Sequence, residues 1–210
     1  MSKRISILGS TGSIGVNALK VISHLKDEFD IVSLSANKNA DLLIEQANQF
    51  QPKAICIVDE VGFPQVKNAL GSSGTEILKG REGLLELASR DNVDVLLNGL
   101  VGAAGMEPTL KAIEAGIDIA LSNKESLVMA GDIIQQAMKK SGAQLFPVDS
   151  EHSAIWQCLV GENIDDVRRL ILTGSGGPFR SREINTFDDI TVEEALNHPN
   201  WDMGRKITID

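Results

Sequence analysis

The first 142 residues alternate six times between a short β-rich run and a pattern with the apolar periodicity of a helix. Parallel strands need a long, right-handed crossover connection, and a helix is the usual one. The alternation therefore predicts an α/β fold with a doubly wound parallel sheet. The expected strands are 4–9, 31–36, 53–59, 75–80, 93–100 and 117–122, and the expected helices are 13–25, 40–50, 62–70, 81–90, 106–116 and 125–142.

The rhythm changes from about Phe146 onward. Residues 166–179 predict a strand that runs into a glycine-rich loop, and residues 191–201 predict a short capped helix. The 65 or so residues after the alternating part are too few for a second domain with a core of its own. We therefore expect a dinucleotide-binding domain at 1–145, followed at 146–210 by the beginning of an α+β catalytic domain.

Charge and hydropathy exclude several classes of function. The formal charge is −9, and adjacent basic residues form isolated pairs but no larger cluster, which argues against binding to nucleic acid or to an anionic membrane. No apolar run approaches the roughly 20 residues of a membrane span, and none fits a signal peptide. We expect a cytoplasmic protein. Cys56 and Cys158 lie in apolar contexts, where buried, inert thiols are expected rather than reactive ones.

The segment GSTGSIG, residues 9–15, lies between the first strand and the first helix. Its glycines would let the backbone turn tightly and approach a pyrophosphate, which the N-terminus of the following helix would bind. This position predicts a Rossmann-like dinucleotide site, with a plain tight turn as the alternative. The second strand ends in Asn37, Lys38 and Asn39 instead of an acid. An acid there would bind the ribose of NAD, whereas Lys38 could bind a 2′-phosphate, so the sequence favours NADP; a solvated loop lysine is the alternative.

A cluster of acidic residues follows the extended run at 144–146. Asp149 and Glu151 are two positions apart, so their carboxylates can point to one side and hold Mg²⁺ or Mn²⁺. The alternative is a helix N-terminus in which Ser150 is the cap and the acids interact with the dipole. His152 is either a further ligand or structural.

Two other stretches lie where ligands bind in such folds. Asn123, Lys124 and Glu125 follow the sixth strand, at the carboxyl edge of the sheet. Ser175 lies among glycines in the stretch 172–179, whose amides could surround a phosphate or form an ordinary turn.

Five of these motifs together resemble the 1-deoxy-D-xylulose 5-phosphate reductoisomerase family, and the resemblance extends over essentially the whole chain. They are GSTGSIG, SNKESLV, PVDSEHSAIWQ, LTGSGGPFR and HPNWDMGRKITID. The resemblance implies a homodimeric oxidoreductase of non-mevalonate isoprenoid biosynthesis. With NADPH and Mn²⁺ or Mg²⁺ it would rearrange and reduce a small phosphorylated sugar, 1-deoxy-D-xylulose 5-phosphate, to 2-C-methyl-D-erythritol 4-phosphate.

The resemblance also implies three groups of site residues. The cofactor-binding group is Thr11, Gly12, Ser13, Ile14, Asn37, Lys38, Asn39, Asn123, Glu125 and Gly204. The substrate-binding group is Lys124, Ser150, Glu151, Ser175, His198 and Trp201, of which Lys124, Glu151 and His198 are implied to be catalytic. Asp149 and Glu151 are the implied metal ligands, and Trp201 and Met203 belong to an implied mobile loop.

Family members are nearly twice as long as this chain. The resemblance implies that a third metal-ligating glutamate and an asparagine–lysine phosphate clamp lie beyond Asp210, so we expect these residues alone to be inactive. Two other functions stay compatible with the sequence. One is a different NADP-dependent oxidoreductase such as a semialdehyde dehydrogenase, which would need a nucleophilic cysteine. The other is a non-catalytic NADP-binding fragment, which would not need Asp149 or Glu151.

Overall fold

The computed structural model describes residues 2–25, 27–174 and 176–200. The chain divides into two compact units, Met1–Ser153 and Ala154–Asp210. The first unit carries the sheet and nearly all of the buried side chains. None of the helices in the described ranges combines the length and the apolar character needed to cross a bilayer.

The described strands of the first unit form one parallel sheet in the order β4-β3-β2-β1-β5-β6-β7. The prediction of a doubly wound parallel sheet is confirmed, because the order runs outward from β1 in both directions. The strands are β1 Lys3–Leu8, β2 Phe29–Ala36, β3 Ala54–Ile57, β4 Glu76–Lys79, β5 Val95–Asn98, β6 Asp118–Leu121 and β7 Leu145–Pro147. Strand β7 is the extended run noted before Asp149, and it pairs with β6 at the edge of the sheet.

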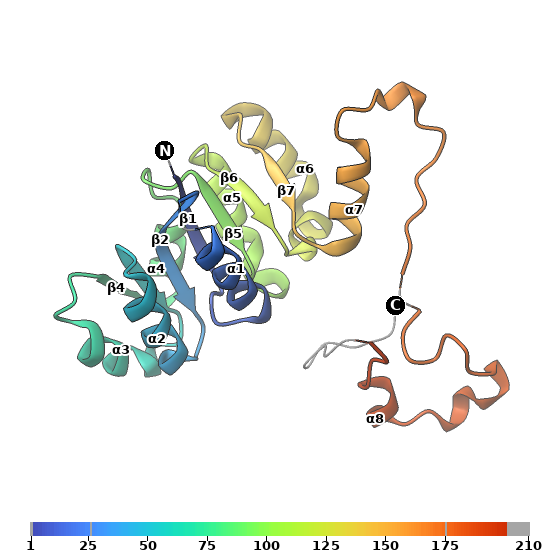
Figure 1. Ribbon diagram of the computed structural model, residues 1–210, viewed down its shortest axis with the longest axis horizontal. Helices are drawn as coiled ribbons and strands as arrows, with labels where there is room; N and C mark the ends of the chain where they lie inside the picture. The colour runs from blue at the N-terminus through green and yellow to red at the C-terminus, as the bar shows by residue number, and fades with distance from the viewer. Residues whose placement is uncertain (1, 26, 175, 201–210) are drawn as a thin grey trace. The chain divides into compact units, whose positions relative to one another are not determined.

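Helices cover both faces of this sheet (Figure 1). Each helix expected in the alternating part is present: α1 Ser13–His24, α2 Ala40–Phe50, α3 Phe63–Leu70, α4 Gly80–Ala88, α5 Met106–Glu114 and α6 Lys124–Ser141. Two short 3₁₀ turns, η1 Glu60–Gly62 and η2 Gly102–Gly105, precede α3 and α5. A helix therefore connects each strand from β1 to β7 with the next strand in the chain, as parallel strands require.

The core consists of two apolar clusters, one on each face of the sheet. Helices α1, α2 and α3 contribute to one cluster, for example through Leu19, Leu43 and Val66. Helices α4, α5 and α6 contribute to the other. Neighbouring residues of one strand belong to opposite clusters, as Leu96 and Leu97 of β5 do. Burial on both faces explains why these strands read as continuous apolar runs.

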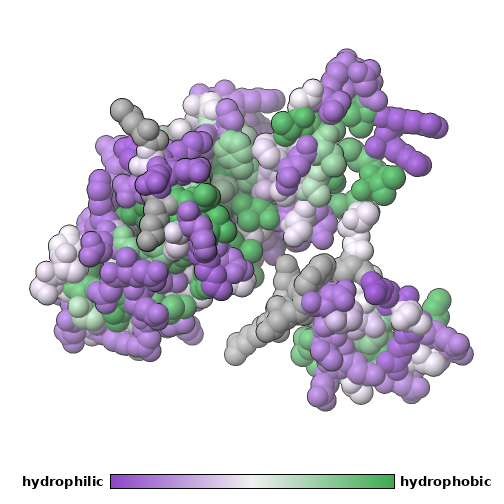
Figure 2. Space-filling view, viewed as in Figure 1, coloured by the Kyte–Doolittle hydropathy of each residue, from purple (hydrophilic) through white to green (hydrophobic). Residues whose placement is uncertain are grey.

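The second unit contains little buried surface. Helix α7, Ser150–Leu159, leads into it and has no buried residue. The 3₁₀ turns η3 Ile164–Asp166 and η4 Ile184–Asp189 follow, and then α8, Val192–Ala195, which begins with a capping box between Thr191 and Glu194. Among its described residues only Gly177 and His198 are buried, and apolar side chains lie at its surface (Figure 2).

Two expectations for this unit were wrong. The strand expected from residue 166 is absent, and residues 167–174 have no regular structure. A strand needs a hydrogen-bonded neighbour, and the described part of this unit contains no other strand. Cys158 was expected to be buried but is exposed, because no face of α7 is packed away from solvent. Cys56 of β3 is buried, as expected.

An ion pair joins the amino ends of β1 and β5. Arg4 donates from Nη2 to Asp94 Oδ1 at 2.6 Å and from its backbone N–H to Asp94 Oδ2 at 2.8 Å. The hydrogen bonds from Arg4 lower the pKa of the Asp94 carboxyl to about 2. The pair lies at the edge of the sheet opposite the glycine turn, and it gives a pH-dependent contribution to stability.

We predict that Asp94→Asn lowers the melting temperature at neutral pH and that this difference vanishes in acid. The folded carboxyl has a depressed pKa, so its stabilising contribution is present above the unfolded pKa of about 4 and is lost as the pH falls towards 2. Thermal melts between pH 7 and pH 2 measure the difference, with Asp132→Asn on the exposed surface of α6 as the control. A difference that stayed constant over this range would contradict the prediction.

Candidate active site

The glycine turn after β1 lets α1 begin very close to the strand. Gly9 has φ +79°, and the Gly12 N–H donates to the Gly9 carbonyl at 3.0 Å. A Cβ atom on Gly15 would lie 2.4 Å from the Gly9 oxygen, which no side chain can tolerate. The first turn of α1 therefore packs directly on the turn only because glycine occupies these two positions.

The N-terminus of α1 points its amides out of this turn. Among the described residues no side chain caps the helix, and its first turn contains no acid. The first amides of a helix have no partner within it, so they can bind an anion. Gly12 and Ser13 are exposed and Thr11 and Ile14 are half-buried. The structure thus brings these four predicted cofactor residues together at the carboxyl edge of β1.

The loop after β2 lies beside the glycine turn. The Ser10 N–H donates to the Ser35 carbonyl at 2.7 Å, and the Gly9 N–H donates to Ser35 Oγ at 3.1 Å. Residues 37–39 follow directly and are exposed. The two parts of the predicted NADP site are therefore neighbours.

Lys38 is available to a ligand. Its Nζ lies 4.0 Å from Asp59 Oδ2, and its side chain is 78% exposed. An exposed ion pair of this length contributes little, so a phosphate could replace the carboxylate. Asn39 has a structural role as well, because its Oδ1 accepts from the Leu42 N–H at 3.1 Å and caps α2.

The strand order reverses between β1 and β5, where ligands bind in open α/β sheets. The loop after β5 contacts the glycine turn: the Gly99 N–H donates to the Leu8 carbonyl at 3.0 Å. A Cβ atom on Gly9 would lie 3.2 Å from the Gly99 oxygen. The glycine turn and this second loop thus border the crevice at the reversal.

Asn123 fixes this second loop and the start of α6. Its Nδ2 donates to the carbonyls of Leu100 at 2.9 Å and Gly102 at 2.8 Å. Its Oδ1 accepts from the N–H of Ser126 at 2.9 Å and also from the Ser126 hydroxyl. The side chain is 1% exposed. All of its hydrogen-bonding positions are used inside the protein, which leaves its backbone for the implied cofactor contact.

Asp149 is the centre of an electrostatic cluster at the end of β7. Lys124 Nζ donates to its Oδ2 at 2.6 Å, and His152 Nδ1 lies 2.6 Å from its Oδ1. Partial burial raises the pKa of Asp149, but the hydrogen bonds from Lys124 and His152 more than offset this and keep the pKa well below its usual value. The hydrogen bond between Lys124 and Asp149 also raises the pKa of Lys124, and the negative charges of Glu151 and Glu125 make smaller contributions. Asp149 is therefore ionised and Lys124 protonated at neutral pH.

The helix that was the alternative to a metal site is present together with this cluster. Helix α7 begins at Ser150, with Glu151 half-buried in its first turn. The Ser153 N–H donates to the Asp149 carbonyl at 2.8 Å, so Asp149, and not Ser150, occupies the cap position. The described residues include no group of three His, Cys, Asp or Glu side chains arranged to hold a metal ion.

Several implied site residues are not part of this geometry. Ser175, Trp201, Met203 and Gly204 lie outside the described residues. His198 belongs to the second unit, where it is 8% exposed and its Nδ1 accepts from the Asn200 N–H at 3.1 Å.

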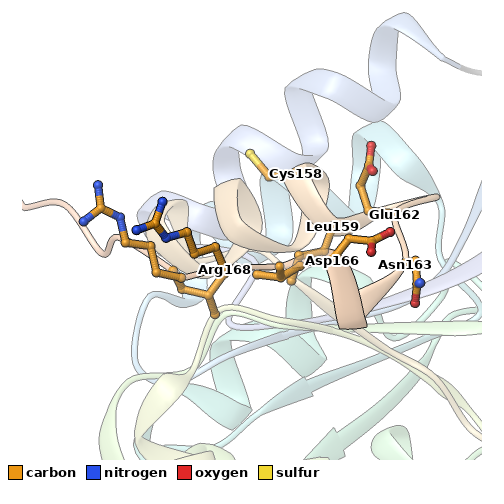
Figure 3. Close-up of a pocket in the computed structure, with 9 residues that line it drawn as sticks. Cys158, Leu159, Glu162, Asn163, Asp166 and Arg168 are labelled. Atoms are coloured by element: carbon orange, nitrogen blue, oxygen red, sulfur yellow. The ribbon is translucent and has the colours of Figure 1, made fainter.

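A hollow of about 460 Å³ in the second unit is lined by none of the implied site residues (Figure 3). Glu162 and Asp166 lie towards one end of it and Arg168 extends towards the other.

Sequence reasoning missed Gln46, a polar side chain that is buried beneath the glycine turn. It contacts Ser10 through both atoms of its amide group. A signal was present, because Gln46 follows Leu43 by three positions and so falls on the apolar stripe of α2. A polar residue on such a stripe calls for a buried partner.

The sequence and the fold of this chain are similar to those of known proteins. The sequence profile described as 1-deoxy-D-xylulose 5-phosphate reductoisomerase matches residues 5–131, and the profile of its C-terminal domain matches residues 145–210. The chain belongs to the 1-deoxy-D-xylulose 5-phosphate reductoisomerase family. The reductoisomerase of Chloroherpeton thalassium is 51% identical over 99% of this chain, and that of Halothermothrix orenii is 47% identical over 100%.

Solved structures of the family have the same fold. The Zymomonas mobilis enzyme in complex with NADPH gives a TM-score of 0.89 at 39% identity, over 95% of this chain and 52% of that one. A reductoisomerase in complex with NADPH, fosmidomycin and magnesium gives 0.87 at 40% identity, over 96% of this chain and 52% of that one. The chain spans about half the length of the curated relatives, 54% in both cases above.

We predict that Asn123→Ala destabilises the first unit by about 2–4 kcal/mol, because it removes several buried hydrogen bonds and leaves their partners unsatisfied. Asn39→Ala is the matched control: it removes one exposed cap bond and should cost about 1 kcal/mol. Urea denaturation of both variants measures the two free energies. Equal losses would contradict the structural role given to Asn123.

Proposed function

We propose that this protein converts 1-deoxy-D-xylulose 5-phosphate to 2-C-methyl-D-erythritol 4-phosphate in non-mevalonate isoprenoid biosynthesis, with NADPH and Mg²⁺ or Mn²⁺. Membership of the reductoisomerase family is the observation that carries the proposal. Relatives solved with NADPH and magnesium support the choice of cofactors. In this proposal, the described residues would form the nucleotide site and part of the metal site.

The nucleotide site fits NADPH in three respects. The glycine turn has no side chains at Gly9, Gly12 and Gly15, so a pyrophosphate can approach its backbone. Gly15 packs so closely on the Gly9 carbonyl that no Cβ atom would fit between them. The uncapped first turn of α1 offers amides and a partial positive charge. Lys38 lies after the neighbouring strand with its ammonium group exposed, where it can pair with a 2′-phosphate. An NAD site would instead have an acid at the end of β2.

The metal site fits in part. Asp149 and Glu151 supply oxygen ligands of the kind that Mg²⁺ and Mn²⁺ prefer. The ionised carboxylate of Asp149 has lone pairs beyond those used by Lys124 and His152, so it can accept a cation. When bound, the cation would polarise substrate oxygens as a Lewis acid and NADPH would donate the hydride.

The chain's own residues orient the substrate in this proposal. Lys124 holds a positive charge beside Asp149 and would attract the phosphorylated sugar or its developing negative charge. Ser150 and Glu151 begin α7 and would contact the substrate next to the metal. The contacts of Ser175, His198, Trp201 and Gly204 are proposed from the resemblance alone.

Expectations about domains, assembly and location also belong to this proposal. We assign cofactor binding to residues 1–145 and the start of the catalytic domain to residues 146–210, which the profile of the C-terminal domain, at 145–210, supports. We expect the whole protein to form a homodimer in the cytoplasm, as the resemblance implies.

A semialdehyde dehydrogenase is disfavoured. Burial raises the pKa of the Cys56 thiol to about 12, so this cysteine cannot supply the thiolate that such chemistry needs. Family membership points the same way. A non-catalytic NADP-binding protein differs from the proposed enzyme in having no use for the metal ligands, and metal binding therefore separates the two.

We predict that the chain binds NADPH more tightly than NADH and that Lys38→Ala removes most of this preference. A charge-assisted contact to the 2′-phosphate is worth roughly a tenfold difference in Kd or more. Fluorescence titration with both nucleotides measures it. Lys53→Ala, which changes an exposed lysine before β3, is the control. Equal affinity of the unchanged chain for NADPH and NADH would contradict the assignment of Lys38.

We predict that Asp149→Asn and Glu151→Gln each weaken Mn²⁺ binding by roughly tenfold or more, because each removes a charged oxygen ligand. Electron paramagnetic resonance of free Mn²⁺ during titration gives the affinities, and Asp132→Asn on α6 controls for the loss of one negative charge. Binding of NADPH together with Mn²⁺ affinities unaffected by either change would favour the non-catalytic nucleotide-binding protein.

A further inference from the structure

Gln46 is a buried amide that grips the backbone of the glycine turn. It lies on the inner face of α2 and is 4% exposed. Its Nε2 donates to the Ser10 carbonyl at 2.9 Å, and its Oε1 accepts from the Ser10 hydroxyl at 2.7 Å. One side chain thus binds two groups of a single residue in the turn.

The chemistry of the two partners fixes the orientation of the amide. A carbonyl oxygen only accepts, so the NH₂ group of Gln46 must face the Ser10 carbonyl and its oxygen must face the hydroxyl. Burying an amide is costly unless its hydrogen bonds are made. An apolar residue at this position on α2 would leave the buried Ser10 carbonyl without its partner, so the contact of Gln46 serves the glycine turn as well as the packing of α2.

The contact completes the anchoring of Ser10. The Ser10 N–H donates to the Ser35 carbonyl of β2 at 2.7 Å, and the Ser10 hydroxyl lies 3.2 Å from the same carbonyl. Gln46 on α2 binds the Ser10 carbonyl and, at the shorter distance of 2.7 Å, the Ser10 hydroxyl. The side chain of Ser10 is fully buried, and each polar group of the residue has a hydrogen-bond partner. Gly9 and Thr11 are the residues on either side of Ser10, so Ser10 is a fixed point in the middle of the glycine turn.

This fixed point lies directly beneath the amides proposed to bind the pyrophosphate. Gly15 packs on the Gly9 carbonyl and on the Ser10 Cα, with 2.4 Å from each to a hypothetical Gly15 Cβ. A shift of Ser10 would therefore displace the start of α1. We infer that Gln46 is a positioning residue that holds Ser10, and with it the glycine turn, in the conformation that binds the cofactor's pyrophosphate.

The inference rests on the proposed NADPH-binding function, but it makes a claim about the turn that can be tested without cofactor. Gln46→Met keeps the length of the side chain and removes both hydrogen bonds. Leu43→Ala, three positions earlier on α2, is the matched control: Leu43 is fully buried in the apolar cluster, so its loss lowers stability without removing a contact to Ser10.

Hydrogen exchange of the 210-residue chain without cofactor is the first arm of the experiment. We expect the amides of Ser10 and Gly12 to exchange about tenfold faster in Gln46→Met. In Leu43→Ala they should keep their protection relative to the rest of the sheet, despite a lower melting temperature. Unchanged exchange in Gln46→Met, or the same local change in both variants, would overturn the inference.

Ligand affinity is the second arm. We expect Gln46→Met to raise the Kd for NADPH about tenfold. The Kd for adenosine 2′-monophosphate should change by less than about twofold, because this ligand has no pyrophosphate and would reach only the Lys38 end of the site. Equal weakening of both ligands would indicate a general loss of structure and overturn the inference, as would unchanged NADPH affinity. A failure of the unchanged chain to bind NADPH would contradict the proposed function. The hydrogen-exchange measurement, which needs no cofactor, would still show whether Gln46 orders the glycine turn.

Discussion

The close approach of α1 to the turn after β1 is the constraint on which the rest of the site depends. A Cβ atom on Gly15 would lie 2.4 Å from the Gly9 oxygen, so the helix can begin here only without side chains at these positions. The amides at its N-terminus are thereby brought to the point where the strand order reverses. Ser35 and Gln46 then hold the turn from β2 and α2. The geometry of the turn that is proposed to bind phosphate is thus produced by packing and buried hydrogen bonds.

A second feature of the site is electrostatic. Lys124 and His152 both contact the carboxylate of Asp149, which keeps this side chain ionised despite partial burial. A carboxylate that is already charged loses no proton when it binds a cation. In the proposed function, Asp149 would therefore bind a metal ion as a carboxylate, and the charge of Lys124 beside it would attract the anionic substrate. The cluster joins the start of α6 to the end of β7, so the fold of the first unit sets its geometry.

The sequence was sufficient for the sheet and its helices because their signals are local. Apolar runs such as 93–100 and the periodicity of α2 are set by burial against the sheet. The glycine turn and the carboxylates could be recognised for the same reason. The prediction of a strand from residue 166 was wrong because a strand needs a hydrogen-bonded neighbouring strand, whose presence no local sequence pattern specifies. Gln46 and the full use of Asn123 depend on partners distant in the chain, which alternation and spacing do not reveal.

NADPH is proposed to bind between the glycine turn after β1 and the loop after β2. Amide chemical shifts of the isotope-labelled chain, followed during a titration with NADPH, test this proposal. We predict the largest shifts at Gly12, Ser13 and Ile14 and at the loop 37–39, with small shifts at the Arg4–Asp94 edge of the sheet. Saturable binding with its largest shifts elsewhere, or no shifts at either loop in a folded chain, would contradict it.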